Sequence, residues 1–362
     1  MKGTPALRHL KVGDVVAGRY RLLQEIGRGG MGLVYKARQL DNGREVALKT
    51  LHMHLVDDDE ARQRFEREIS MIQRLQSPHT VAIFDAGIDG TVPYFTMELL
   101  DGLPLQRVLG GSGALPARMA VQITLQLLQS LDEAHTLGIM HRDLTPPNVF
   151  LCRHSTQIFH VKVLDFGLAK HFNQKGRSRL TGGGVALGTL PYMAPEQLKR
   201  GTLGPTTDLY MVGHLLFEML AGHNLYRGMD NAQIVHHKLG KLRVPIHGEP
   251  MQGPLGSVIH KALQIEQEHR YHNAAQMRQH LAVQARLLPE TPIPPSLLEQ
   301  ARPQHTAAPG EPTRAFAPPT RQPSLEVDAD TRPHPKPPVT ERRRNLGQST
   351  RPPWEPPITM EQ

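Results

Sequence analysis

The sequence lacks the marks of membrane and secreted proteins. No apolar run in its 362 residues approaches the ~18 to 20 residues of a membrane helix, and the N-terminus has no apolar signal core. Cys152 is the only cysteine, so no internal disulfide can form, which fits a reducing compartment. We therefore expect a cytoplasmic protein without a membrane span.

Aromatic residues are also few, with nine Phe, seven Tyr and one Trp, and no basic cluster is interleaved with them. The formal charge of +8 alone would permit a nucleic-acid partner. Residues 289–362 hold nine basic and nine acidic side chains, so the excess lies in the rest of the chain. The missing basic–aromatic clusters argue against nucleic acid.

Proline divides the chain, because 18 of its 31 prolines fall at or after Pro289. We expect an N-terminal extension at 1–19, a folded part at 20–286 and a disordered, proline-rich tail at 287–362. The tail is either a solvated linker or a docking segment for phosphothreonine- or proline-recognising modules. If it is a docking segment, the stretch around Trp354 is the best candidate for a short recognition motif.

Residues 141–148 read His-Arg-Asp-Leu-Thr-Pro-Pro-Asn, and Asp165-Phe166-Gly167 follows after a short apolar run. Asp143 is a candidate base, and Asn148 and Asp165 are hard oxygen ligands of the kind that magnesium prefers. Two carboxylates sharing a pocket repel unless a divalent cation lies between them. This stretch therefore predicts phosphoryl transfer from a metal-bound nucleotide.

A glycine-rich stretch, residues 27–34, lies between strand-like segments at 20–26 and 33–37. A dinucleotide fold would need a following helix and a Walker loop would need Gly-Lys-Ser/Thr, and neither is present. The remaining readings are a plain hairpin turn and a loop that covers phosphates with bare backbone amides.

Lys49 ends a strand-like segment at 45–49, and a helix is predicted over 61–76 from the spacing of its apolar residues. Glu68 lies on the apolar stripe of this helix, where a carboxylate needs a partner, whereas Glu66 lies on the polar face. We predict that Lys49 pairs with Glu68; the alternative is an ordinary exposed lysine. Further strands are predicted at 81–84 and 94–97, and helices at 117–135, 208–221, 231–239, 254–263 and 274–288.

The order of these motifs resembles the protein-kinase fold over residues 20–286, in particular the bacterial eukaryotic-like (Hanks-type) serine/threonine kinases. The resemblance implies an α+β, two-lobed fold, with a small antiparallel β lobe at about 20–98 and a mainly helical lobe at about 99–286. It implies ATP and two Mg²⁺ as cofactors, with Asp143 as base, Lys49 oriented by Glu68, and Asn148 and Asp165 as metal ligands. It implies a nucleotide site formed by Gly27, Arg28, Gly29, Gly30, Met31, Gly32, Val34, Ala47, Lys49, the gatekeeper Met97, Glu98, Leu100 and Phe150.

The resemblance also implies structural and regulatory roles. Glu196, in Ala194-Pro195-Glu196, would pair with Arg270, and Asp208 would anchor the catalytic loop. Arg142 would receive a phosphate placed on Thr181 or Ser178 by autophosphorylation.

Thr145 departs from the family pattern, because lysine usually stands at this position and meets the transferred phosphate. A hydroxyl supplies no positive charge there. The leading prediction is a serine/threonine protein kinase that acts on protein substrates in signal transduction. The alternative is a nucleotide-binding pseudokinase or scaffold with weak transfer activity. A small-molecule kinase is disfavoured by the segment ending in Ala194-Pro195-Glu196.

Overall fold

The computed structural model describes residues 10–29, 32–51, 59–153, 159–166, 189–199, 201–240 and 249–290, together with residues 295 and 297. The chain divides into two units, residues 1–306 and 307–362, and all described residues belong to the first. Most of the predicted tail lies outside the described residues, so its disorder stays a prediction. No helix in the described ranges is long and apolar enough to cross a membrane.

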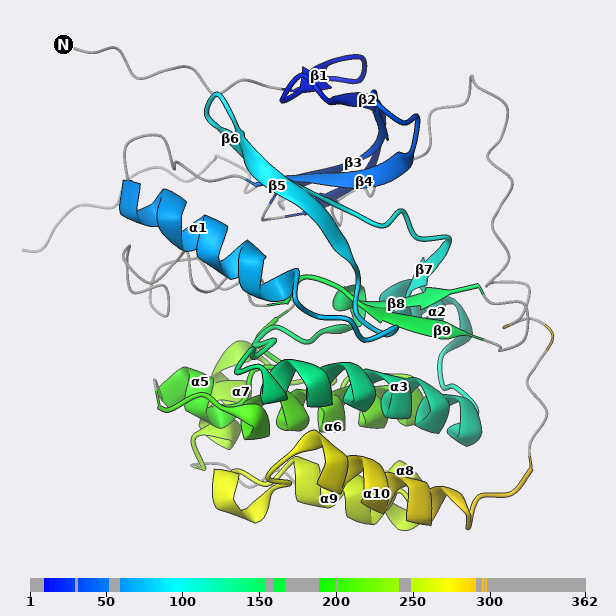
Figure 1. Cartoon of the computed structure of the whole chain (residues 1–362). Helices are drawn as coiled ribbons and strands as arrows, with labels where there is room; N and C mark the ends of the chain where they lie inside the picture. The colour runs from blue at the N-terminus through cyan, green and yellow to red at the C-terminus, as the bar shows by residue number, and fades with distance from the viewer. Residues whose placement is uncertain are drawn as a thin grey trace, which may run out of the picture. The chain divides into compact units, whose positions relative to one another are not determined.

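The first part of the chain forms a six-stranded antiparallel sheet with the order β1-β2-β3-β4-β6-β5 (Figure 1). Alternation sets its faces: Tyr20 and Leu22 of β2 are buried, while Arg21 between them is exposed. The strand predicted at 81–84 begins two residues later, at Ile83, and continues to Asp89. The strands are β1 (Val15–Val16), β2 (Tyr20–Gly29), β3 (Gly32–Gln39), β4 (Glu45–Leu51), β5 (Ile83–Asp89) and β6 (Val92–Met97).

Part of the predicted N-terminal extension packs with this sheet. Val16 of β1 pairs with Tyr20 and is fully buried, and Leu10 packs in the same apolar cluster. The hydroxyl of Tyr35 donates a hydrogen bond of 3.0 Å to the carbonyl of Leu10. No motif in residues 1–19 predicted this packing, and the strand that forms there has only two residues.

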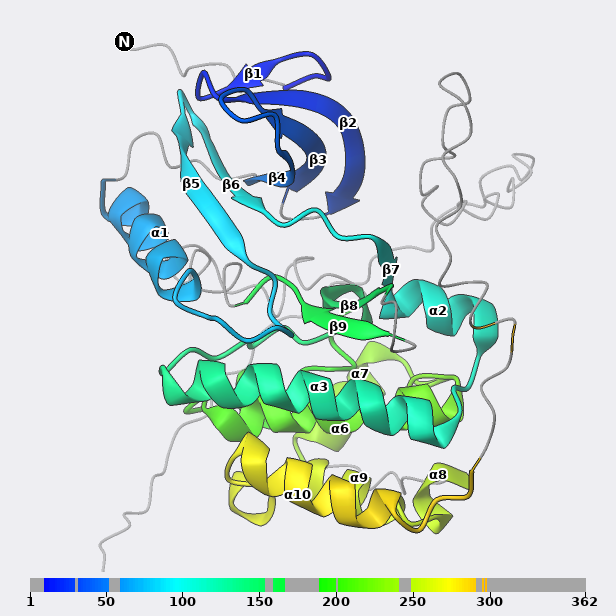
Figure 2. The same ribbon diagram turned by 45° about the vertical axis from the view of Figure 1, so that its right-hand side comes forward.

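Helix α1 (Asp59–Ile72) lies beside β5 in both views of the fold (Figures 1 and 2). Phe65, Ile69 and Ile72 are buried, as the helical spacing predicts. The helix ends at Ile72, four residues before the predicted end.

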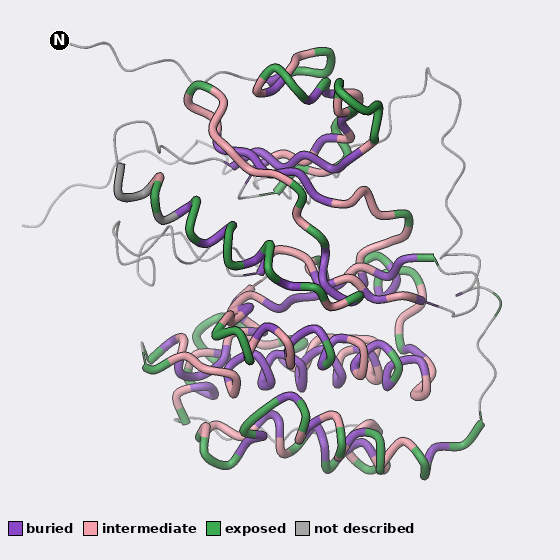
Figure 3. Tube along the Cα trace, in the orientation of Figure 1, coloured by how far each residue is buried: buried purple, intermediate pink, exposed green. Residues whose placement is uncertain are grey.

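The rest of the described chain is mostly helical. The three-stranded sheet β7-β8-β9 consists of β7 (Gly102–Pro104), β8 (Val149–Cys152) and β9 (His160–Val163). Helix α6 (Pro205–Ala221) is buried along almost its whole length and packs beside α3 (Ala117–Thr136), as Figure 3 shows. The other helices are α2 (Leu105–Ser112), α5 (Pro195–Lys199), α7 (Asn231–Lys238), α8 (Glu249–Gln252), α9 (Gly256–Ala262) and α10 (Ala274–Ala285), with short 3-10 turns at Pro146–Asn148 and Gln267–His269.

Packing continues beyond the predicted end of the folded part at residue 286. Leu288 and Leu297 are buried in the main core. The guanidinium of Arg118, on α3, donates hydrogen bonds of 2.9 Å to the carbonyls of Leu288 and Pro289. The proline-rich composition therefore begins before the core ends.

Candidate active site

Asp208, near the start of α6, holds the loop at residues 141–148 through hydrogen bonds to its backbone. The carboxylate of Asp208 accepts hydrogen bonds of 2.8 Å from the backbone N–H groups of His141 and Arg142, and another of 2.8 Å from Nε2 of His135. Full burial opposes ionisation of Asp208, but the bond from His135 and the other donors outweigh it, and the pKa is lowered. Asp208 thus occupies the anchoring position that was predicted for it.

His141 connects this loop to the segment that carries Asp165. Its Nε2–H donates to the carbonyl of Leu164 at 2.8 Å, and its Nδ1 accepts from the N–H of Asp143 at 3.3 Å. The imidazole ring packs against the ring of Phe166, with centroids 4.8 Å apart. The neutral Nε2–H tautomer satisfies both contacts, so the ring holds Asp143 and Asp165 in a fixed relation.

Two residues of the site have left-handed backbone conformations that are uncommon outside glycine. Arg142 has φ of 63° and Asp165 has φ of 56°. Each such conformation costs about 1 to 3 kcal/mol and persists only where the surroundings enforce it. Arg142 is enforced by Asp208 on its N–H and by Gln197 of α5, whose Nε2 donates to the Arg142 carbonyl at 2.9 Å.

Lys49, on β4, forms its ion pair with Asp165 at 2.5 Å. The predicted pairing of Lys49 with Glu68 stays a prediction. Glu68 is buried on α1, as expected from its place on the apolar stripe. The contact of Lys49 with Asp165 was not predicted, because it depends on how β4 and the segment after β9 lie relative to each other.

The donor set at Asn148 and Asp165 fits magnesium. The side-chain nitrogen of Asn148 donates to the carbonyl of Asp143 at 2.8 Å, which turns the amide oxygen away from that contact. The N–H of Leu164 donates to the Asn148 carbonyl at 2.9 Å and so ties the two ligand-bearing segments together. Amide and carboxylate oxygens are the ligands that Mg²⁺ takes alongside water and phosphate.

The glycine-rich stretch joins β2 to β3, with Gly27 opposite Val34 and Gly29 opposite Gly32. A Cβ on Gly32 would lie 1.6 Å from the carbonyl oxygen of Thr50, so only glycine fits there. Gly30 and Met31 lie outside the described residues.

The predicted adenine-contacting residues lie on the strands and the connection that follows them. Ala47 on β4 pairs with Met97 at the end of β6. The N–H of Glu98 donates to the Ala82 carbonyl at 3.0 Å, which leaves the carbonyl of Glu98 as its backbone group for a ligand. The carboxylate of Glu98 pairs with Lys162 of β9 at 2.6 Å and fixes the connection between the two sheets. The roles of Met97, Glu98, Leu100 and Phe150 stay predictions.

A cavity of about 390 Å³ lies beside the loop. Its walls include Thr145, Thr189, Tyr192 and Glu218. Thr145 is buried, and the contact predicted between Thr189 and Asp143 stays a prediction. The cavity offers hydroxyls and one carboxylate where the usual lysine is missing.

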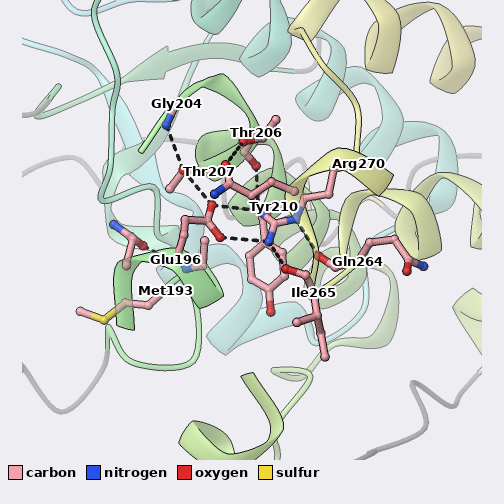
Figure 4. Close-up of polar contacts among 12 residues, drawn as sticks. Met193, Glu196, Gly204, Thr206, Thr207, Tyr210, Gln264, Ile265 and Arg270 are labelled. Carbon is pink, nitrogen blue, oxygen red and sulfur yellow. Dashed lines mark hydrogen bonds and ion pairs between the residues drawn. The ribbon is translucent and has the colours of Figure 1, made fainter. Parts of the chain in front are cut away.

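Glu196 and Arg270 form the buried, bidentate pair predicted from the sequence (Figure 4). The two nitrogen–oxygen distances are 2.9 and 3.0 Å. Arg270 also donates to the carbonyls of Gln264, Thr206 and Ile265, and its guanidinium lies 4.7 Å from the ring centroid of Tyr210. Thr207 donates its hydroxyl proton to Glu196 at 2.8 Å. All five N–H groups of the Arg270 guanidinium thus donate, and the pair joins α5, α6 and the turn before α10.

Three contributors to the site were not found from the sequence. His135 and Gln197 hold Asp208 and Arg142, and Lys238 of α7 contacts the segment before α5. His135 is the last residue of the predicted helix at 117–135, but no spacing rule links it to Asp208. Gln197 and Lys238 read as ordinary helical residues. The predicted phosphorylation sites Ser178 and Thr181, and Gly167, lie outside the described residues.

Comparisons with known proteins agree with this arrangement. Residues 20–281 match the family model of the protein kinase domain. Serine/threonine-protein kinase Pkn1 of Myxococcus xanthus is 39% identical over 276 residues, covering 74% of this chain and 38% of that protein. Serine/threonine-protein kinase PknB of Mycobacterium tuberculosis is 32% identical over 269 residues, covering 73% and 42% respectively. The crystal structure of the PknI kinase domain from M. tuberculosis is similar with a TM-score of 0.60 at 26% identity, covering 76% of this chain and 99% of that one.

The chain therefore belongs to the protein kinase family. The predicted fold class and the resemblance to bacterial serine/threonine kinases are confirmed. The chain spans about two fifths of the length of the curated relatives it matches.

Proposed function

We propose that this protein is a serine/threonine protein kinase that transfers the γ-phosphate of Mg-ATP to hydroxyl groups of protein substrates. The observation that carries the proposal is the loop geometry: Asp208 and His141 position Asp143 beside Asn148 and Asp165, with Lys49 in contact with Asp165. The names of the curated relatives support the choice of serine and threonine as acceptors.

In this proposal, Asp143 orients the acceptor hydroxyl and takes its proton. Asn148 and Asp165 would hold the metal ions, which neutralise phosphate charge when bound. Lys49 exchanges its contact with Asp165 for the α and β phosphates of the nucleotide. The glycine-rich stretch from Gly27 to Gly32 covers these phosphates with backbone N–H groups.

Regulation by autophosphorylation in signal transduction is part of the proposal. A phosphate on Thr181, or second on Ser178, adds about −1.5 to −2 charges and would be received by Arg142. The left-handed backbone of Arg142, fixed by Asp208 and Gln197, supports this role because its position is set from two sides. Mass mapping after incubation with Mg-ATP tests it, and an unmodified segment in active enzyme would reject it.

A cytoplasmic site of action is proposed from Cys152. Burial raises the pKa of its thiol to about 12, and such a free thiol fits a reducing compartment. Recognition of the tail around Trp354 by phosphothreonine- or proline-reading modules is also a proposal, tested by pull-down with and without residues 289–362.

The decisive experiment is labelling with [γ-³²P]ATP in the presence of Mg²⁺ and a generic protein acceptor. Wild type should transfer phosphate, and Asp143→Asn should be slower by about 10²- to 10⁴-fold. Asp132→Asn is the matched control and should behave as wild type, because Asp132 is partly exposed on α3 and makes only a loose ion pair with Arg278 at 3.9 Å. Equal, negligible transfer by wild type and Asp143→Asn with intact nucleotide binding would favour the scaffold alternative.

A further inference from the structure

Lys238, at the end of α7, is completely buried, which is rare for a lysine. Its Nζ atom donates to the carbonyls of Pro191 and Met193, at 2.8 and 2.5 Å. Both carbonyls belong to the segment 189–193, which precedes α5. The Lys238 amine thus ties two backbone carbonyls of this segment to α7.

The surroundings of the amine are aromatic. Nζ lies 5.0 Å from the ring centroid of Tyr210 and 4.8 Å from that of Tyr226, with the Tyr210 hydroxyl at 3.5 Å. Met193 and Tyr210 are drawn together beside the Glu196–Arg270 pair in Figure 4. The amine therefore joins the segment 189–193 to the ion pair that fixes α5 and α6.

Burying a lysine amine at this position costs free energy. Burial lowers its pKa well below the ordinary value, and the charge of Arg270 lowers it further, while Glu196 acts in the opposite direction. The carboxylate of Glu196 is already paired with Arg270, and no other carboxylate of the described residues forms an ion pair with Lys238. Packing alone would be served better by Met or Leu, which points to a need for the N–H donors.

Lys238 can donate hydrogen bonds to both carbonyls whether its amine is charged or neutral. A neutral amine keeps two N–H donors, one for each carbonyl, and a lone pair that can accept from the Tyr210 hydroxyl. An ammonium has three donors for the same three groups and adds attraction to the two rings. In both states Pro191 and Met193 are held.

The segment held by Lys238 forms a wall of the cavity beside Thr145. Thr189 and Tyr192 line this cavity, and Tyr192 lies between the two anchored carbonyls in sequence. Resting on the proposed function, we propose that Lys238 is a positioning residue for the protein substrate: it fixes the 189–193 backbone against which the acceptor chain binds. Its hydrogen bonds within the described part of the chain go to Pro191, Met193 and Tyr210, which are not residues of the predicted nucleotide site.

The test is Lys238→Met, which keeps the length and apolar bulk of the side chain and removes the donors. We expect the KM for a protein acceptor to rise by about tenfold or more, because two buried carbonyls lose their donor and the wall becomes mobile. The affinity for a fluorescent ATP analogue should be unchanged. Lys261→Met is the matched control, because Lys261 also lies over a tyrosine ring in the same helical part, 4.8 Å from the centroid of Tyr271.

Amide hydrogen exchange supplies a readout independent of transfer. Lys238→Met should speed exchange in residues 189–198 and leave α3 and α6 protected, whereas Lys261→Met should not. The proposal would be overturned if Lys238→Met changed neither the KM nor the exchange rates. It would also be overturned if the variant lost nucleotide affinity and exchange protection throughout the fold, because Lys238 would then have a purely structural role. If wild type transfers no phosphate, the proposed function fails, and the exchange comparison still decides whether Lys238 holds the segment.

Discussion

Lys49 and Asp165, 116 residues apart in the sequence, are joined by an ion pair of 2.5 Å that links β4 to the end of β9. The Lys49 side chain is only 10% exposed and that of Asp165 is 22% exposed, so solvent screens the pair weakly. A charge held in such a place interacts strongly with phosphate groups that approach it. The pair therefore joins the strands to the segment that carries the predicted metal ligand Asp165.

Replacing Lys49 by Met should abolish most of the phosphoryl transfer. The loss of one preorganised charge typically lowers kcat by about 10²- to 10³-fold. Lys36→Met is the control, because Lys36 lies on the neighbouring strand β3 and pairs with Glu45 at 2.7 Å on the surface. Measured initial rates of ³²P transfer that fall equally in both variants would contradict the role of Lys49.

Breaking the Glu196–Arg270 pair should destabilise the fold severely. Glu196→Gln or Arg270→Met leaves a buried charge without its partner, at a cost of about 3 to 5 kcal/mol in the free energy of unfolding. The double variant Glu196→Gln/Arg270→Met should lose less than the sum of the two single variants, because no isolated charge remains. Urea unfolding followed by circular dichroism measures all three.

The control for this series is Glu266→Gln. Glu266 approaches Lys199 at 4.0 Å with both side chains exposed, so its loss should change the unfolding free energy by less than about 1 kcal/mol. A loss at Glu266 as large as that at Glu196 would show that burial is not the cause.

Sequence reasoning succeeded where a residue's environment follows from periodicity or from a long motif. The apolar spacing of α3 gave its length to within one residue, and Glu196 and Arg270 were paired because both stand in recognisable motifs. It failed where the outcome depends on the relative placement of distant elements. The contact of Lys49 with Asp165 is one such case, and the burial of Lys238 is another.

Glu218 should make stability depend on pH. Burial raises the pKa of its carboxyl, and the hydrogen bond of 2.6 Å from Tyr192 opposes this shift without cancelling it. The folded protein then binds this proton more tightly than the unfolded chain, so stability falls as pH rises from the unfolded pKa of about 4.3 through the folded pKa. The Glu218→Gln variant has no carboxyl to titrate and so avoids this loss of stability. Its free energy of unfolding should therefore rise relative to that of wild type between about pH 4.5 and pH 7.

Glu45→Gln serves as the comparison for the pH series. Hydrogen bonds from Lys36 and Arg38 lower the pKa of Glu45, so its contribution is complete above the unfolded pKa and is lost only at more acidic pH. Its difference from wild type should therefore stay constant over the same range. Parallel curves for Glu218→Gln and Glu45→Gln in urea unfolding would refute the assignment.

Thr145→Lys should raise the rate of phosphoryl transfer. Thr145 is buried on the wall of the cavity beside Asp143's loop, where a hydroxyl offers one hydrogen bond but no positive charge to the phosphate in the transition state. A lysine that reaches the same place should increase kcat by on the order of tenfold, with the KM for ATP little changed. Thr136→Lys, at the exposed end of α3, adds the same charge away from the loop and controls for non-specific attraction of acceptor or nucleotide. Equal rates for Thr145→Lys and wild type would mean that the missing charge is supplied by another residue or is not needed for this site to work.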